Sequence, residues 1–80
     1  MKEFIEYIIK QIVATPGEVK VEEINENGIF VYYVTVAKDD MGTLIGKEGR
    51  NIKSIRNMAK AKAIKDDVNI SVVIKEDDQI

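Results

Sequence analysis

The sequence predicts a small α+β domain in which helices pack on one face of a three-stranded sheet, in the order helix, strand, strand, short helix, helix, strand. Three observations support this fold class: helical spacing of apolar residues in two segments, strand-like alternation in three others, and an Asn-Gly pair between two of the strands. Eighty residues suffice for one domain, so we expect a single unit over 1–80 whose acidic last residues, 76–80, are frayed.

The first segment, residues 2–14, has the periodicity of a helix that lies on a core. Its charged residues fall opposite an apolar stripe. Thr15-Pro16-Gly17 is expected to end this helix, because the residue before a proline is disfavoured in the α region. The stripe consists of Phe4, Ile5, Ile8, Ile9 and Ile12.

Two strands joined by a tight turn follow. Val19 and Val21 alternate with charged residues and predict the first strand, while Glu23-Ile24 breaks the alternation and predicts a bulge or a strand end. Asn27-Gly28 predicts a hairpin turn because both residues tolerate positive φ. Residues 29–37 are β-branched and aromatic and predict the second strand. We expect its core-facing residues to be Phe30, Tyr32, Val34 and Val36, and we expect Tyr33 on the surface.

The second half predicts two helices and a last strand. Asp39 or Asp40 is expected to cap a short helix that starts near Met41 and is interrupted by Gly46. A longer helix is predicted from about Arg50 to Lys65. After a turn at residues 66–67, apolar residues alternate again in the third strand, at Val68, Ile70, Val72 and Ile74.

The charge distribution is uneven although the net charge is only −2. Residues 42–65 carry seven basic side chains and one acidic side chain, whereas the segments on either side are acidic. A basic stripe on an acidic body favours local phosphate binding, and a solvated lysine-rich helix face is the alternative interpretation. On a helical wheel one arc of the long helix collects Arg50, Lys53, Arg56, Asn57 and Lys60.

The segment Gly46-Lys47-Glu48-Gly49 lies between the two predicted helices and leads into the long one. The first amides of a helix lack internal partners and carry partial positive charge, which favours phosphate. Lys47 and Arg50 add full charges there. The alternative is a C-cap glycine at Gly46 and an unrelated Gly49. A P-loop fits poorly, because only three residues separate Gly42 from Gly46 and no Ser or Thr follows Lys47.

Enzymes, metal proteins and membrane proteins are disfavoured. The chain has no cysteine and no histidine, which removes thiolate ligands and the commonest general base. The sequence shows neither a nucleophile–base pair nor a cofactor fingerprint, so we predict no enzyme activity, no metal, no cofactor and no small-molecule substrate. The chain also shows no secretory signal and no apolar run of bilayer length, which predicts a cytoplasmic protein that does not insert into membranes.

The stretch from Val36 to Arg56 resembles a K-homology (KH) domain, with its strand, aspartate, short helix, I-G-x-x-G loop and second helix. An added helix and strand before this core, and none after it, resembles the type II arrangement. The extent of the chain is similar to the small stand-alone bacterial KH proteins of the KhpA (YlqC) type. The resemblance implies binding of single-stranded RNA with broad specificity, as a post-transcriptional regulator or RNA chaperone, and pairing with other KH proteins.

The resemblance also implies which residues bind RNA. Gly46, Lys47, Glu48 and Gly49 would clamp the backbone of about four nucleotides, with the acidic Glu48 weakening the affinity. Arg50 and Lys53 would meet phosphates. Ile45 and Ile52 would line an apolar groove together with the last strand, and ordinary core positions are the alternative for both. A different functional class is a protein-interaction or dimerisation module that uses the stripe of the first helix and exposed strand faces.

Overall fold

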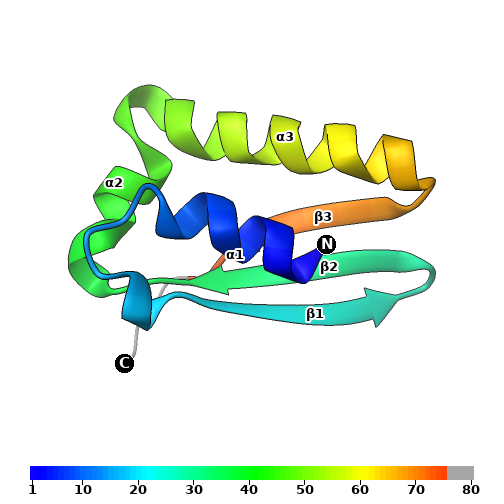
Figure 1. The fold of residues 1–80 in the computed structure, drawn as a ribbon, viewed down its shortest axis with the longest axis horizontal. Coiled ribbons are helices and arrows are strands. Elements are labelled where there is room, and N and C mark those ends of the chain that lie inside the picture. Colours follow the sequence, from blue (N-terminus) through cyan, green and yellow to red (C-terminus); the bar gives the residue numbers. More distant parts are fainter. Residues whose placement is uncertain (76–80) are drawn as a thin grey trace.

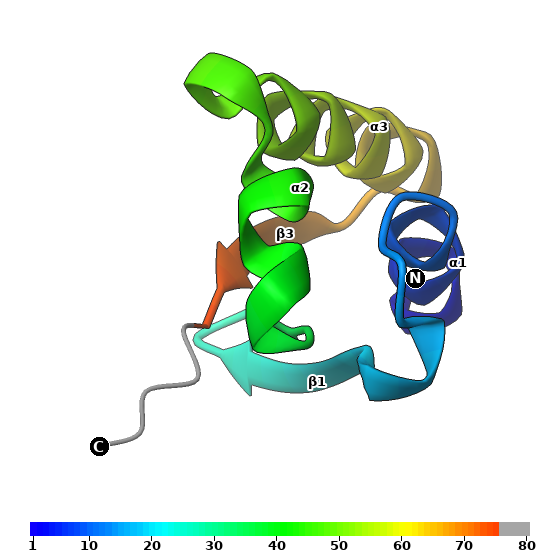
Figure 2. The ribbon, with the colours of Figure 1, turned by 90° about the vertical axis from the view of Figure 1, so that its left-hand side faces the viewer.

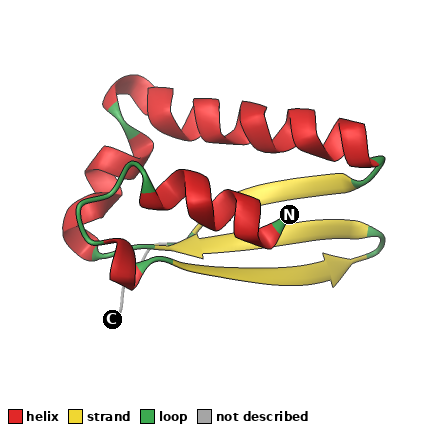
Figure 3. Ribbon diagram, viewed as in Figure 1, coloured by secondary structure: helices red, strands yellow, loops and turns green. Residues whose placement is uncertain are grey.

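Residues 1–75, described in a computed structural model, form a layer of helices on one face of a three-stranded sheet (Figures 1 and 3). The expected tail at 76–80 lies outside the described residues. Within residues 1–75, no helix is both long and apolar enough to cross a membrane. The elements follow the predicted αββααβ order: α1 (Lys2–Lys10), β1 (Lys20–Glu26), β2 (Ile29–Thr35), α2 (Met41–Ile45), α3 (Arg50–Asp66) and β3 (Asn69–Ile74).

The sheet has the order β1-β2-β3, with β2 in the centre. β1 pairs with β2 in antiparallel fashion through a turn at Asn27 (φ 57°) and Gly28 (φ 87°), as predicted. β3 runs parallel to β2, so the chain must cross the helical side of the sheet between them. α2 and α3 make that crossover (Figure 2), which places the glycine segment in the helical layer.

The core lies between the helices and one face of the sheet. Tyr32, Val34 and Val36 are buried there and Phe30 is partly buried against them, which confirms the predicted inner face of β2. Burial and the neighbouring Glu23 carboxylate raise the pKa of Tyr32 above its ordinary value. The helices contribute fully buried side chains from three elements: Ile5 and Ile9, Leu44, and Ile55.

Two predicted boundaries are wrong. α1 ends at Lys10 rather than near residue 14, because the amides of Ala14 and Thr15 bond to a distant side chain instead of to carbonyls of the preceding turn. β1 has neither a bulge nor an early end at Glu23-Ile24, since every residue from Lys20 to Glu26 pairs in one continuous register. The alternation fails because only Val21 of this edge strand is buried.

Asp40 is the only buried charged side chain among the described residues, with 4% of its surface exposed. Asp40 occupies the N-cap position of α2, as one of the two predicted candidates, but the capping hydrogen bond expected from its side chain is not formed. Asp40 precedes α2, but neither carboxylate bonds to the amides of that helix. Instead Oδ1 of Asp40 accepts from the N–H of Ala14 (3.1 Å), and Oδ2 accepts from the N–H of Thr15 (2.9 Å). The carboxylate thereby joins the segment after α1 to the start of α2.

Candidate nucleic-acid interface

The chain reverses sharply between α2 and α3, in a turn that projects from one end of the helical layer (Figures 1 and 2). Gly46 has φ 79° and ψ 170°, a combination open essentially to glycine alone. Glu48 (φ 57°) and Gly49 (φ 74°) are left-handed. Gly46 is the C-cap of α2, as the alternative interpretation held, but Gly49 is not unrelated, since it is the N-cap of α3.

The turn leaves two backbone amides without partners. Gly46 N–H donates to the Gly42 carbonyl (2.8 Å), and Gly49 N–H donates to the Gly46 carbonyl (3.1 Å). Within residues 1–75 no carbonyl accepts from the amides of Lys47 and Glu48. These two N–H groups lie just before a 17-residue helix, where the helix dipole favours an anion. The turn can therefore donate two hydrogen bonds to a phosphate.

Exposed cations continue from the turn along α3. Lys47, Arg50 and Lys53 are all exposed, and Arg56 and Lys60 follow on the same arc. The ion pair found among the described residues, Lys62 Nζ to Asp66 Oδ2 at 3.4 Å, lies outside this arc. The cations of the arc therefore remain available to an outside anion. Glu48 is also exposed, and its charge opposes an anion at the turn.

The two isoleucines assigned to the apolar groove differ in their surroundings. Ile45, at the end of α2, has 38% of its surface exposed and lies next to Gly46. Ile52 has 8% exposed and belongs to the core, as the alternative interpretation held. Ile45 alone of the two offers a substantial apolar surface beside the turn, whereas Ile52 supports the first turns of α3 from beneath.

A groove of about 660 Å³ runs between α3 and β3. Arg56 and Lys60 line its helical side, and Ile70 and Val72 line its strand side. Arg56 Nε donates to the carbonyl of Val72 (3.2 Å), so this carbonyl of the sheet edge is partnered by a side chain rather than by another strand. The sequence placed Arg56 and Lys60 in the basic arc but did not select them as site residues. The position of β3, which pairs in parallel with β2 and lies beside α3, is what identifies Arg56 and Lys60 as groove residues.

The family of the chain follows from comparison with known proteins. Residues 2–74 match the family model described as "KhpA/KhpB, KH domain". The chain belongs to the KhpA/KhpB family of KH domains. This membership confirms the KH resemblance seen in the sequence and makes the chain a non-enzymatic KH protein, as predicted.

Curated members of the family are similar to the chain over most of its length. The protein named RNA-binding protein KhpA in Chlamydia trachomatis is 46% identical over 77 residues, which cover 96% of this chain and 99% of the relative. The protein of the same name in Clostridium acetobutylicum is 40% identical over 74 residues, covering 92% and 99%. That in Thermotoga maritima is 46% identical over 61 residues, covering 76% and 81%.

Proposed function

We propose that this chain binds single-stranded RNA at the turn of residues 46–49 and along α3, in the cytoplasm, as a post-transcriptional regulator or RNA chaperone of broad specificity. The observation that carries the proposal is the pair of unpartnered amides, of Lys47 and Glu48, at the start of a helix whose exposed arc is basic. The name of the relatives, RNA-binding protein KhpA, supports the same partner.

The geometry supports a division of contacts between backbone and bases. Phosphates of the RNA accept from the two free amides and meet Lys47, Arg50 and Lys53, which fixes the path of the strand without reading its sequence. The bases turn toward Ile45 and the groove beside β3. A single strand is favoured over a duplex, because its bases are free to unstack and enter a groove. Because Glu48 and the acidic body oppose anions, we expect micromolar or weaker affinity.

The salt dependence of binding tests this arrangement. For single-stranded RNA the logarithm of the binding constant falls with the logarithm of salt concentration, by about 0.7 for each phosphate neutralised. We expect the Lys53→Ala variant to bind more weakly and to lose about 0.7 of this slope. The measurement is a titration of a labelled, unstructured RNA by fluorescence anisotropy at several salt concentrations.

Lys2→Ala is the matched control for this titration, because Lys2 is also exposed on a helix but lies on α1. The control should bind as the unchanged protein does. Equal losses of slope in the two variants would mean that the RNA is held by diffuse charge and not along α3.

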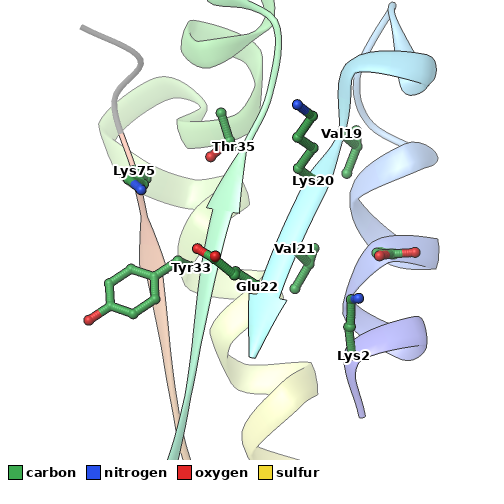
Figure 4. A pocket seen from close by; sticks show the side chains of 9 residues that line it. Lys2, Val19, Lys20, Val21, Glu22, Tyr33, Thr35 and Lys75 are labelled. Atoms are coloured by element: carbon green, nitrogen blue, oxygen red, sulfur yellow. The ribbon is translucent and has the colours of Figure 1, made fainter. Parts of the chain in front are cut away.

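A second candidate function is self-association through the open face of the sheet. Helices cover one face only. On the other face Ile24 and Ile29 are exposed, Tyr33 and Val73 are half-buried, and the buried Val31 lies between them. A hollow of about 580 Å³ lies at the β1 edge of the sheet. Figure 4 shows Tyr33, Thr35 and Lys75 among its sheet residues and Lys2 on α1 at its other side.

Charge favours one arrangement of two such faces. Lys20 lies at one end of β1 and Glu26 at the other, both on the open face. If two copies stack with antiparallel strands, Lys20 of each lies opposite Glu26 of the other. If the strands are parallel, Lys20 lies opposite Lys75, which costs energy. We therefore propose the antiparallel pair, with a second copy as the partner.

Sedimentation at increasing protein concentration tests the pairing. Lys20→Glu should weaken the dimer, and adding Glu26→Lys to that variant should restore it. A protein that stays monomeric at high concentration excludes self-pairing through this face. If neither substitution changes the amount of dimer, the contact between the two copies lies elsewhere.

A further inference from the structure

Asn51 connects the two ends of the turn. Its side-chain Nδ2 donates to the backbone carbonyl of Thr43 at 2.6 Å, so the first turn of α3 is bonded to α2 across eight residues. In an uninterrupted helix the Thr43 carbonyl would accept from the amide of Lys47. The chain leaves the helix at Gly46, and the Asn51 side chain takes the place of that amide.

The backbone of the turn is packed against the same residue. A Cβ placed on Gly46 would lie 2.9 Å from both the backbone nitrogen and Cγ of Asn51. Such a separation is too short for real atoms, and one of the two neighbours is backbone that cannot move aside alone. Gly46 therefore allows the close approach that the Asn51 hydrogen bond holds.

This contact matters because α2 is short. It has five residues, and an isolated helix of that length is not stable in water. The contact between Gly46 and Asn51 and the bond to Thr43 fix the end of α2 relative to α3. The segment between them, Lys47–Gly49, contains the two amides without partners.

We infer that Asn51 is a positioning residue for RNA binding. Its side chain holds the turn in the conformation that presents the amides of Lys47 and Glu48, so that less conformational freedom is lost when a phosphate binds. Asn51 acts through the turn and makes no contact with the RNA in this inference. The inference rests on the proposed function of the turn.

RNA titration of Asn51→Ala tests the inference, with Gln11→Ala, which removes an exposed side-chain amide at the end of α1, as the control. Loss of one hydrogen bond that orders the turn should raise the dissociation constant of Asn51→Ala about fivefold. The factor should be the same at every salt concentration, because no phosphate contact is removed. This unchanged slope separates a positioning residue from a cation such as Lys53.

Amide hydrogen exchange without RNA provides the second measurement. The N–H groups of Gly49 and Arg50 bond within the turn, so their exchange should be faster in Asn51→Ala and unchanged in Gln11→Ala. If Asn51→Ala does not fold, Asn51→Asp replaces it in the exchange measurement. Aspartate has the size of asparagine and suits a helix start, but its carboxylate cannot donate a hydrogen bond to the Thr43 carbonyl.

The outcomes separate this inference from the proposed function. If the unchanged protein binds RNA and Asn51→Ala binds equally well, the inference is overturned and the function stands. If the unchanged protein does not bind RNA, the function fails, and exchange at Gly49 and Arg50 still decides whether Asn51 holds the turn. Unaltered exchange in both Asn51 variants overturns that role.

Discussion

A variant with both Lys47→Asp and Glu48→Asp is expected to lose measurable binding to single-stranded RNA and to keep its fold. Both side chains are exposed, so their replacement disturbs no packing. Position 48 has φ 57° and ψ 27°, which aspartate tolerates better than most residues. The first substitution exchanges a cation for an anion beside the two amides proposed to receive the phosphate. Binding that starts at micromolar or weaker affinity should then fall by roughly tenfold or more, below the range that the titration detects.

The measurement is fluorescence anisotropy with a labelled single-stranded RNA, together with a thermal unfolding curve for each variant. Lys2→Asp is the control because it changes the net charge by the same amount at an exposed site on α1, where an acidic residue suits the helix start. RNA binding by the double variant at full strength would show that the turn is not the site.

Replacing Asp40 with alanine is expected to lower the free energy of unfolding by about 2 kcal/mol, because two backbone amides lose a charged acceptor at a nearly buried position. For a domain of this size that corresponds to a fall of roughly 10 °C in Tm. The stability of Asp40→Asn should lie between that of the unchanged protein and that of Asp40→Ala, since the side-chain amide retains one acceptor oxygen. Urea unfolding measures the change in the free energy of unfolding, and thermal unfolding measures the change in Tm.

The neighbouring Asp39 provides the control for the loss of acidic charge, because it is exposed and makes neither of the bonds to Ala14 and Thr15. Asp39→Ala should change the stability by less than about 0.5 kcal/mol. Equal effects at the two positions would mean that the loss of acidic charge, and not the pair of hydrogen bonds, sets the stability.

The contrast between these two aspartates shows which features of the fold could be predicted from the sequence. Local signals predicted the hairpin at Asn27-Gly28, the long helix and the bend at Gly46, since each depends on neighbouring residues. They also predicted the second strand, over residues 29–37, and that strand ends two residues earlier, at Thr35. The partner of Asp40 could not be predicted in this way. It lies 25 residues away in sequence, and it also determines where α1 ends.

For the candidate site, too, local features could be predicted from the sequence and contacts between distant segments could not. Charge and glycine spacing indicated the turn and the arc of Arg50 and Lys53. Helical periodicity could not separate Ile45 from Ile52, because their exposure depends on how α2 and α3 sit on the sheet. The groove beside Arg56 and the bond of Asn51 to Thr43 arise only when elements distant in sequence meet.

The parallel pairing of β3 with the central strand has a consequence for biosynthesis. Residues 69–74 are synthesised after all the other helices and strands described, and they supply one wall of the groove and complete the sheet on which α3 lies. A nascent chain that ends before residue 69 can form the hairpin, but it lacks this edge strand. The domain can therefore complete its fold only after residues 69–74 have left the ribosome, and chains truncated before these residues should be open to proteolysis.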